Sequence, residues 1–371
     1  MNKLTQTRYR EAIDSILPYS PGKPIEEVAR ELGLEPASIM KLASNENPLG
    51  PSPLAVAAMR AHLADVRIYP DSDSYALRHA LAAHIGMAAD QVVIGRGSDE
   101  IMHFLSIAYL QAGDEVVMGE PPFSMYEIST KLMDATPVKV PLKDFAHDLS
   151  AMADAVTPRT KLMYIANPHN PTGAMNAKAE VDALLARVPA HVLVVLDEAY
   201  YEYVTRDDYP DTREYLREGR NVLVMRTFSK IYALAGLRVG YAFSSRPEVL
   251  FAINQVREPF NVANIAQWAA IASLQDADQV PRSRAVNEAG KAYLYAAFTR
   301  LGLPYVPTET NFILVDTRHP CREVFARLLR LGVIVRTGDI FGYPTMIRVT
   351  IGTAEENARF IQSLEQVLAS M

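Results

Sequence analysis

Between positions 91 and 243, short apolar runs rich in β-branched residues alternate with longer stretches whose apolar residues recur at helical spacing. Apolar runs without intervening polar positions are typical of strands buried on both faces, and intervening helices are typical of a parallel sheet. The pattern therefore predicts an α/β domain whose mostly parallel sheet lies between layers of helices. We expect seven strands, at residues 91–94, 115–118, 137–140, 162–166, 192–196, 222–225 and 239–243, and helices at 99–110, 177–187 and 211–218.

On either side of this region the pattern is mainly helical. Helices are expected at 25–34, 53–64 and 75–84 before it, and at 263–277, 281–301, 322–330 and 355–367 after it. Strands at 312–315, 333–336 and 346–350 alternate with the last of these helices, which indicates a second, smaller α+β domain. We expect an N-terminal arm and helix at 1–45 packed on the small domain, a large domain at 46–265 and a small domain at 266–371.

Composition narrows the class of protein. The chain has 371 residues, 49% of them hydrophobic, which is enough for two domains with separate cores. Its net charge of −6 gives a nucleic-acid partner no electrostatic support, and its apolar runs are too short to span a membrane. Residues 1–20 contain no apolar signal segment, and the single cysteine, Cys321, fits a reducing compartment, so we expect a cytoplasmic protein. The histidines show no metal-ligand spacing, and no metal is expected.

Candidate chemistry follows the strands. In sheets of this kind the ligand binds beyond the carboxyl ends of the strands. After the first strand, Gly97, Ser98 and Asp99 open a helix, and free N–H groups at a helix start suit a phosphate. A plain capped turn has the same signature, so this loop alone decides nothing.

The loops after the second, fourth and fifth strands each carry at least one side chain of interest. Phe123, after the second strand, is either a platform for a flat ring or an ordinary core aromatic. Asn170 lies among stacked turn formers that hold its loop rigidly. Asp197 ends an apolar strand and is followed by Tyr200; a buried carboxylate there needs a cationic partner.

The sixth strand leads into Thr227, Ser229 and Lys230, with Arg238 eight positions later. A poorly solvated lysine loses its proton readily and becomes a nucleophile toward an aldehyde. Alone, this stretch is more readily explained as a strand that ends in an exposed lysine. Together, the five loops offer what a phosphorylated pyridine aldehyde requires: phosphate donors, a stacking face, a carboxylate for the ring nitrogen, donors for the phenolic oxygen, and an amine.

The small domain adds two arginines near strand ends, Arg336 and Arg348. A guanidinium binds carboxylate and phosphate groups bidentately, so the pair suits an anionic substrate. Surface salt bridges are an equal alternative for Arg336 and a weaker one for Arg348, which lies inside a strand pattern. Tyr19, in a turn rich in proline, is by itself a packed loop aromatic.

These motifs resemble the fold-type I, pyridoxal-phosphate-dependent aminotransferases, and within them the histidinol-phosphate aminotransferase group. The resemblance runs from Tyr19 to the C-terminus. It rests on Asn45-Glu46-Asn47-Pro48, Tyr69-Pro70, Gly97-Ser98-Asp99-Glu100, Asn167 to Gly173, Asp197-Glu198-Ala199-Tyr200, Thr227-Phe228-Ser229-Lys230, Ala235 to Gly240, and Arg348.

The resemblance implies a role for each site residue. Lys230 would form a Schiff base with pyridoxal 5'-phosphate and later carry a proton, with Asp197 at the ring nitrogen. It assigns the phenolic oxygen to Tyr200 and Asn170, ring stacking to Phe123, and the phosphate to Ser98, Asp99, Thr227, Ser229 and Arg238. Tyr69 would reach the phosphate of the neighbouring subunit, so that a homodimer is required; Arg348 and Asn45, with Tyr19 and Arg336, would bind substrate.

The implied reaction moves an amino group between histidinol phosphate and 2-oxoglutarate, a step of histidine biosynthesis. Transamination of aromatic amino acids, and decarboxylation of an amino-acid phosphate, are alternatives on the same fold. His169 and Phe123 stand where relatives commonly have a small or amide residue and a tyrosine. The sequence leaves open whether the pocket prefers a phosphate or an aromatic ring.

Overall fold

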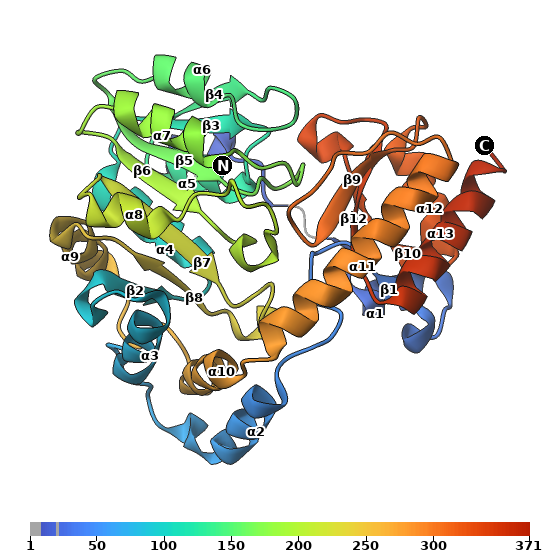
Figure 1. Ribbon diagram of the computed structural model, residues 1–371, viewed down its shortest axis with the longest axis horizontal. Helices are drawn as coiled ribbons and strands as arrows, with labels where there is room; N and C mark the ends of the chain where they lie inside the picture. The colour runs from blue at the N-terminus through green and yellow to red at the C-terminus, as the bar shows by residue number, and fades with distance from the viewer. Residues whose placement is uncertain (1–8, 20–21) are drawn as a thin grey trace, which may run out of the picture.

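The computed structural model describes residues 9–19 and 22–371. The expectations for residues 1–8, and for Ser20 and Pro21 in the proline-rich turn, lie outside the described residues. Two bodies are evident in Figure 1, a larger one built on a wide sheet and a smaller one that contains the C-terminus. The N-terminal helix α1 (Ile25–Leu32) lies with the smaller body, where Val28 packs against Leu329 and Ile334.

The larger body contains the predicted seven-stranded sheet, in the order β2-β8-β7-β6-β5-β3-β4. Only β8 runs antiparallel to its neighbours β2 and β7 among the described strands of this sheet. The prediction of an α/β fold with a mostly parallel sheet is therefore confirmed. The strands are β2 (Val92–Gly95), β3 (Glu115–Glu120), β4 (Thr136–Pro141), β5 (Thr160–Ala166), β6 (Leu193–Asp197), β7 (Val222–Thr227) and β8 (Gly240–Phe243).

Both faces of the sheet are buried, which explains the unbroken apolar runs. In β6, Val194 and Leu196 face one core, whereas Leu193 and Val195 face the other, because successive side chains of a strand point to opposite faces. One core receives α4 (Ser98–Tyr109), α5 (Ser124–Leu132) and α9 (Pro247–Val256). The opposite core receives α2 (Pro53–Ala61), α3 (Tyr75–Ile85), α6 (Leu149–Asp154), α7 (Lys178–Arg187), α8 (Thr212–Arg217) and α10 (Asn264–Gln275).

In the smaller body, β11 (Arg336–Thr337), β12 (Met346–Thr350) and β9 (Phe312–Asp316) form an antiparallel sheet. The prediction of one strand at 333–336 is wrong. β10 (Val333–Ile334) instead pairs in parallel with β1 (Met40–Lys41), and the chain changes partner at Val335. The partner β1 is almost 300 residues away, so no local pattern reveals it. Helices α12 (Cys321–Arg330) and α13 (Ala354–Leu368) pack on this body.

The long helix α11 (Gln279–Arg300) joins the two bodies (Figure 1). The expected boundary between residues 265 and 266 falls inside α10, and α10 packs on α2 and α3 of the larger body. These contacts favour a boundary after α10. Helices α5, α6 and α9 had no counterpart among the predicted elements.

Two classes of feature are absent from the part of the chain that the structure describes. None of its helices combines the length and apolarity needed to cross a membrane. Residues 9–19 and 22–371 also gather no group of three or more histidine, cysteine, aspartate or glutamate side chains that could hold a metal ion.

Candidate active site

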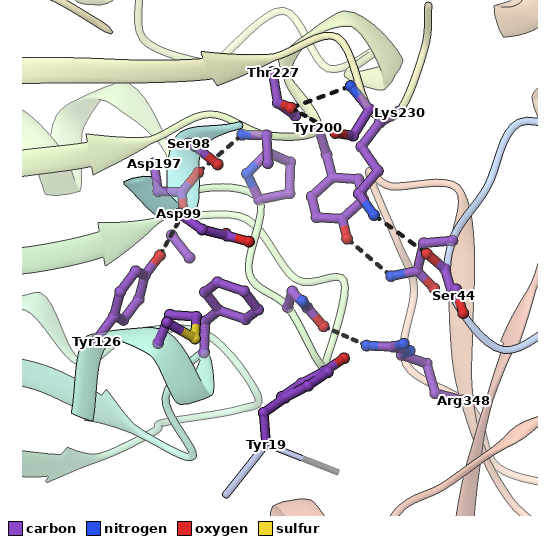
Figure 2. Close-up of a pocket in the computed structure, with 18 of the residues that line it drawn as sticks. Tyr19, Ser44, Ser98, Asp99, Tyr126, Asp197, Tyr200, Thr227, Lys230 and Arg348 are labelled. Atoms are coloured by element: carbon purple, nitrogen blue, oxygen red, sulfur yellow. Dashed lines mark hydrogen bonds between the residues drawn. The ribbon is translucent and has the colours of Figure 1, made fainter. Parts of the chain in front are cut away.

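A cavity of about 240 Å³ lies at the carboxyl ends of β5, β6 and β7, beside the start of α4 and next to the smaller body (Figure 2). Parallel strands bring their carboxyl ends to one edge, so loops far apart in the sequence meet there. The predicted site residues that line the cavity are Tyr19, Asn45, Ser98, Asp99, Phe123, Asn170, Asp197, Tyr200, Thr227, Ser229, Lys230, Arg238 and Arg348.

Lys230 lies on the side of the cavity near the smaller body, with its ammonium group pointing inward. Nζ donates a hydrogen bond to the carbonyl oxygen of Ser44 at 3.2 Å and lies 5.7 Å from the ring centroid of Tyr200. Burial, and then the positive charge of Arg348, lower the pKa of Lys230 from 10.5 to about 8. In a substantial fraction of the protein molecules, Lys230 is therefore a neutral, nucleophilic amine at mildly basic pH.

A cradle for an anion lies next to Lys230. Thr227 Oγ1 donates to Ser229 Oγ at 3.0 Å, and Arg238 Nη1 donates to the same oxygen at 3.3 Å. The start of α4, at Ser98, faces these groups from the other side. Gly97 has a φ of +76°, and a Cβ there would lie 2.6 Å from Arg238 Nη2, so only glycine leaves the guanidinium in place. Hydroxyls, a guanidinium and a helix N-terminus are the donors that bind phosphate.

Asp197 lies on the opposite wall from Lys230 (Figure 2). Tyr126 donates a hydrogen bond of 2.6 Å to Asp197 Oδ2, and the backbone N–H of Ala199 donates to Oδ1 at 3.2 Å. Burial raises the pKa of Asp197 from 3.8 to about 6. The expected cationic partner is not supplied by the described residues, since none of their ion pairs includes Asp197. A hydroxyl and a backbone N–H hold the carboxylate instead, and it faces the cavity.

Tyr200 presents its hydroxyl to the middle of the cavity. Asn45 Nδ2 donates to this hydroxyl at 2.8 Å, so the phenolic proton of Tyr200 remains free to donate to a ligand. Burial raises the pKa of Tyr200 to about 12, which keeps that proton in place at neutral pH. Asn45 has a φ of +58°, a backbone conformation that asparagine tolerates better than most residues.

Arg348 closes the cavity on the side of the smaller body. Its Nη1 donates to Asn170 Oδ1 at 2.5 Å and its Nη2 donates to the carbonyl oxygen of Ala43 at 2.9 Å. Its Nε is buried without a hydrogen-bond partner among the described residues. Burial lowers the pKa of Arg348 to about 10, so the group is still charged at neutral pH and can bind an anion.

Arg336 lies directly opposite Arg348 in the pairing of β11 with β12. It lines a neighbouring cavity rather than the one around Lys230, and its guanidinium lies 5.8 Å from the ring centroid of Tyr19. Tyr19 lines both cavities and therefore connects them. Like charges on opposite residues of two strands repel each other, and, besides burial, the charge of Arg336 contributes to the lowered pKa of Arg348.

The predicted site residue Tyr69 lines neither of these two cavities. Its side chain is 79% exposed and stacks on Phe260, with ring centroids 4.8 Å apart. It does not line the cavity of its own chain.

Sequence reasoning missed Tyr126 and Ser44. Tyr126 lies three residues after Phe123, almost one turn further along α5, and the two rings meet edge to face at 5.6 Å. A helix predicted from residue 124 would have placed Tyr126 beside the same cavity as Phe123. Ser44 contributes only a backbone carbonyl to Lys230, a contact that carries no signal in the sequence.

Comparison with known proteins is consistent with this geometry. Residues 37–364 match the family model described as aminotransferase class I and II. The chain is 54% identical to a histidinol-phosphate aminotransferase of Moorella thermoacetica, covering 98% of this chain and 94% of the relative. It is 48% identical to histidinol-phosphate aminotransferase 2 of Pseudomonas fluorescens, covering 96% of each.

Solved structures of aminotransferases have the same fold as this chain. The histidinol-phosphate aminotransferase of Sinorhizobium meliloti, in complex with pyridoxal-5'-phosphate, superimposes with a TM-score of 0.90 at 29% identity over the whole of both chains. The aspartate aminotransferase of Thermus thermophilus shares the fold, with a TM-score of 0.83 at 24% identity over 99% of this chain. The match to the family model and the identity to the relatives lead to one conclusion: the chain belongs to the class I and II aminotransferase family.

Proposed function

We propose that this protein is a pyridoxal-phosphate-dependent aminotransferase that moves an amino group between histidinol phosphate and 2-oxoglutarate, a step of histidine biosynthesis. The observation that carries the proposal is that one cavity joins a desolvated lysine, a buried carboxylate, an anion cradle and Arg348, with Arg336 in the adjoining cavity. Near-full-length identity to histidinol-phosphate aminotransferases supports this choice of substrate.

The residues present fit pyridoxal phosphate. Thr227, Ser229, Arg238 and the start of α4 suit its phosphate, and Phe123 supplies a face for its ring. Asp197 suits the protonated ring nitrogen, a cation that would stabilise a carboxylate whose pKa burial has raised. Bound there, the cofactor supplies an electron sink for negative charge on the carbon that carries the amino group.

The protein's own groups would supply binding and proton transfer. Asp197, Tyr200 and Asn170 line the cavity. Asp197 would keep a proton on the ring nitrogen of the cofactor, and Tyr200, aided by Asn170, would hydrogen-bond its phenolic oxygen. Lys230 Nζ would hold the cofactor through its amine, and the same atom would remove and return a proton at the carbon that carries the amino group. The donor leaves as its oxo product before the acceptor binds, so the kinetics are ping-pong.

Both substrates carry anions, and the rim of the cavity suits them. Histidinol phosphate has a phosphate and no carboxylate, whereas glutamate and 2-oxoglutarate have two carboxylates. Arg348, whose Nε is unpartnered among the described residues, suits the anion nearest the reacting carbon. Arg336 and Tyr19, which line the adjoining cavity, suit an anion farther from that carbon, either the phosphate of histidinol phosphate or the second carboxylate of glutamate. Asn45 lines the cavity and holds the hydroxyl of Tyr200.

Replacing Arg336 by glutamine tests this choice of substrate. We expect kcat/KM for histidinol phosphate to fall by about 10²-fold, because a charge-assisted contact to phosphate is lost. The value for phenylalanine, which has no distal anion, should change by less than about threefold. Steady-state kinetics with both donors measures the ratio, and Arg330→Gln, at an exposed position of α12, is the matched control. If phenylalanine is the better donor and Arg336→Gln affects neither, the protein is an aromatic aminotransferase.

The pH dependence of cofactor uptake tests the state of Lys230. Only the neutral amine attacks an aldehyde, so the rate at which cofactor-free protein takes up pyridoxal phosphate should rise with pH and level off above about 8. Arg348→Gln removes a charge that lowers this pKa, so its profile should shift to higher pH. Stopped-flow absorbance in the visible range measures both profiles. A wild-type rate that still rises at pH 10 would contradict a desolvated lysine.

We also propose that the enzyme is a homodimer in which Tyr69 completes the phosphate site of the neighbouring subunit. Supporting this, Tyr69 is exposed and lies away from its own cavity, with the exposed apolar side chains of Leu63, Val66 and Ile68 nearby in the sequence. Exposed apolar groups of this extent are typical of surfaces that bind another protein.

A cytoplasmic location, which rests on the single cysteine, stays a prediction.

A further inference from the structure

A buried cluster of three side chains lies beside the cavity without lining it: Glu198, Tyr209 and Arg226. Arg226 Nε donates to Glu198 Oε2 at 2.8 Å, and the side chains of Arg226 and Glu198 are only 5% and 1% exposed. The guanidinium carbon of Arg226 lies 3.5 Å from the ring centroid of Tyr201 and 5.3 Å from that of Phe243. The ion pair is thus enclosed by aromatic rings.

Tyr209 ties this ion pair to another loop. Its hydroxyl lies 3.0 Å from Glu198 Oε1 and 2.6 Å from the carbonyl oxygen of Asn167. Both are acceptors, so the single phenolic proton is shared between them. Burial and the charge of Glu198 raise the pKa of Tyr209 well above its usual value, so the proton stays on the hydroxyl.

The cluster joins three residues that are each close in sequence to a residue of the cavity. Asn167 is three residues before Asn170, Glu198 directly follows Asp197, and Arg226 is four residues before Lys230. Successive side chains of a strand alternate between faces, so Glu198 and Arg226 point away from the face that Asp197 and Thr227 share. The cluster therefore connects three cavity loops from behind.

A buried ion pair of this kind is weak evidence for stability, because removing two charges from water offsets most of their attraction. It does restrict geometry, since a buried guanidinium, carboxylate and hydroxyl satisfy one another in few arrangements. We propose that Glu198, Arg226 and Tyr209 are positioning residues that set the spacing between Lys230, Asp197 and Asn170 while touching neither cofactor nor substrate. This inference rests on the proposed function and deepens it.

The test uses variants that leave no buried charge unpaired. Tyr209→Phe removes one oxygen, and Arg226→Lys keeps the charge but changes the contact geometry. Tyr215→Phe is the matched control, because the hydroxyl of Tyr215 donates to Asp182 at 2.7 Å in the same domain without contacting a cavity loop. The readouts are the dissociation rate of pyridoxal phosphate, the pH titration of its visible absorption band, and the thermal midpoint of the cofactor-free protein.

We expect Tyr209→Phe to raise the dissociation rate about tenfold, which corresponds to one misplaced hydrogen bond. Arg226→Lys should raise it at least as much, and both variants should shift the pH titration of the band. Tyr215→Phe should match wild type in dissociation and titration. A purely structural cluster would lower the thermal midpoint in both variants while leaving the dissociation rate and the titration as in wild type, and that result would overturn the inference. Failure of the proposed function is distinct, because wild type itself would then not bind the cofactor.

Discussion

Lys230→Ala is expected to lower kcat/KM for amino transfer by at least about 10⁴-fold, because the substitution removes both the nucleophile and the group that moves the proton. Among the described residues, Lys230 is the only lysine that lines the cavity, so no neighbouring lysine can take over its role. The variant should also lose the visible absorption that cofactor held by a lysine shows. Activity with glutamate and the absorption spectrum of purified protein measure these effects.

The matched control for this substitution is Lys178→Ala. Lys178 forms an exposed ion pair with Asp182 on α7, and exposed pairs contribute little to stability. This control should retain wild-type activity and colour. A Lys230→Ala protein that was fully active would end the proposal of pyridoxal-phosphate chemistry, whatever the substrate.

Asp197→Asn should lower kcat by roughly 10³-fold, the scale seen when one preorganised electrostatic contact to a developing charge is lost. Asparagine keeps an oxygen for the 2.6 Å hydrogen bond from Tyr126 but cannot hold a proton on a ring nitrogen. KM for both substrates should change much less, because Arg348 and Arg336 are untouched. Steady-state kinetics with saturating cofactor separates the two parameters.

The same substitution should also change how the stability of the cofactor-free protein depends on pH. Because the pKa of Asp197 is raised from 3.8 to about 6, protonation stabilises the folded state at low pH, and that contribution is lost as pH rises through 6. Asparagine has no such dependence. The free energy of unfolding of the variant relative to wild type should therefore increase by roughly 1 kcal/mol between pH 5 and pH 8. Asp208→Asn, at an exposed ion pair with Arg206, is the control, and an equal difference at both pH values would refute the buried charge.

Much of the large domain could be predicted because its signals are local. Six of the seven strands are mainly buried apolar runs that can be recognised within a few residues, whereas the edge strand β4 is only partly buried. The loops that carry the candidate chemistry follow the buried runs directly. Lys230, Asp197 and Asn170 stand in such loops. The rule that ligands bind at the carboxyl ends of parallel strands is therefore sufficient to place these three residues at one site.

Contacts between distant segments were not predictable in this way. The strand expected at 333–336 is divided because residues 40–41 supply a partner for its first half. Tyr126, which donates to Asp197, was missed because no helix was predicted at residues 124–132, where α5 lies. The expected cationic partner of Asp197 is, among the described residues, replaced by that hydroxyl.

By itself, then, the sequence determined the fold class, the aminotransferase resemblance and the set of side chains at the sheet edge, since apolar periodicity and loop composition depend on neighbours along the chain. Only the tertiary structure decided which of those side chains face one another: the register that sets Arg336 opposite Arg348, the contact between Tyr126 and Asp197, and the cluster of Glu198, Arg226 and Tyr209 behind the cavity. The physical reason is that each of these contacts joins separate elements or loops at least 11 residues apart, and their proximity results from tertiary packing rather than from any local preference.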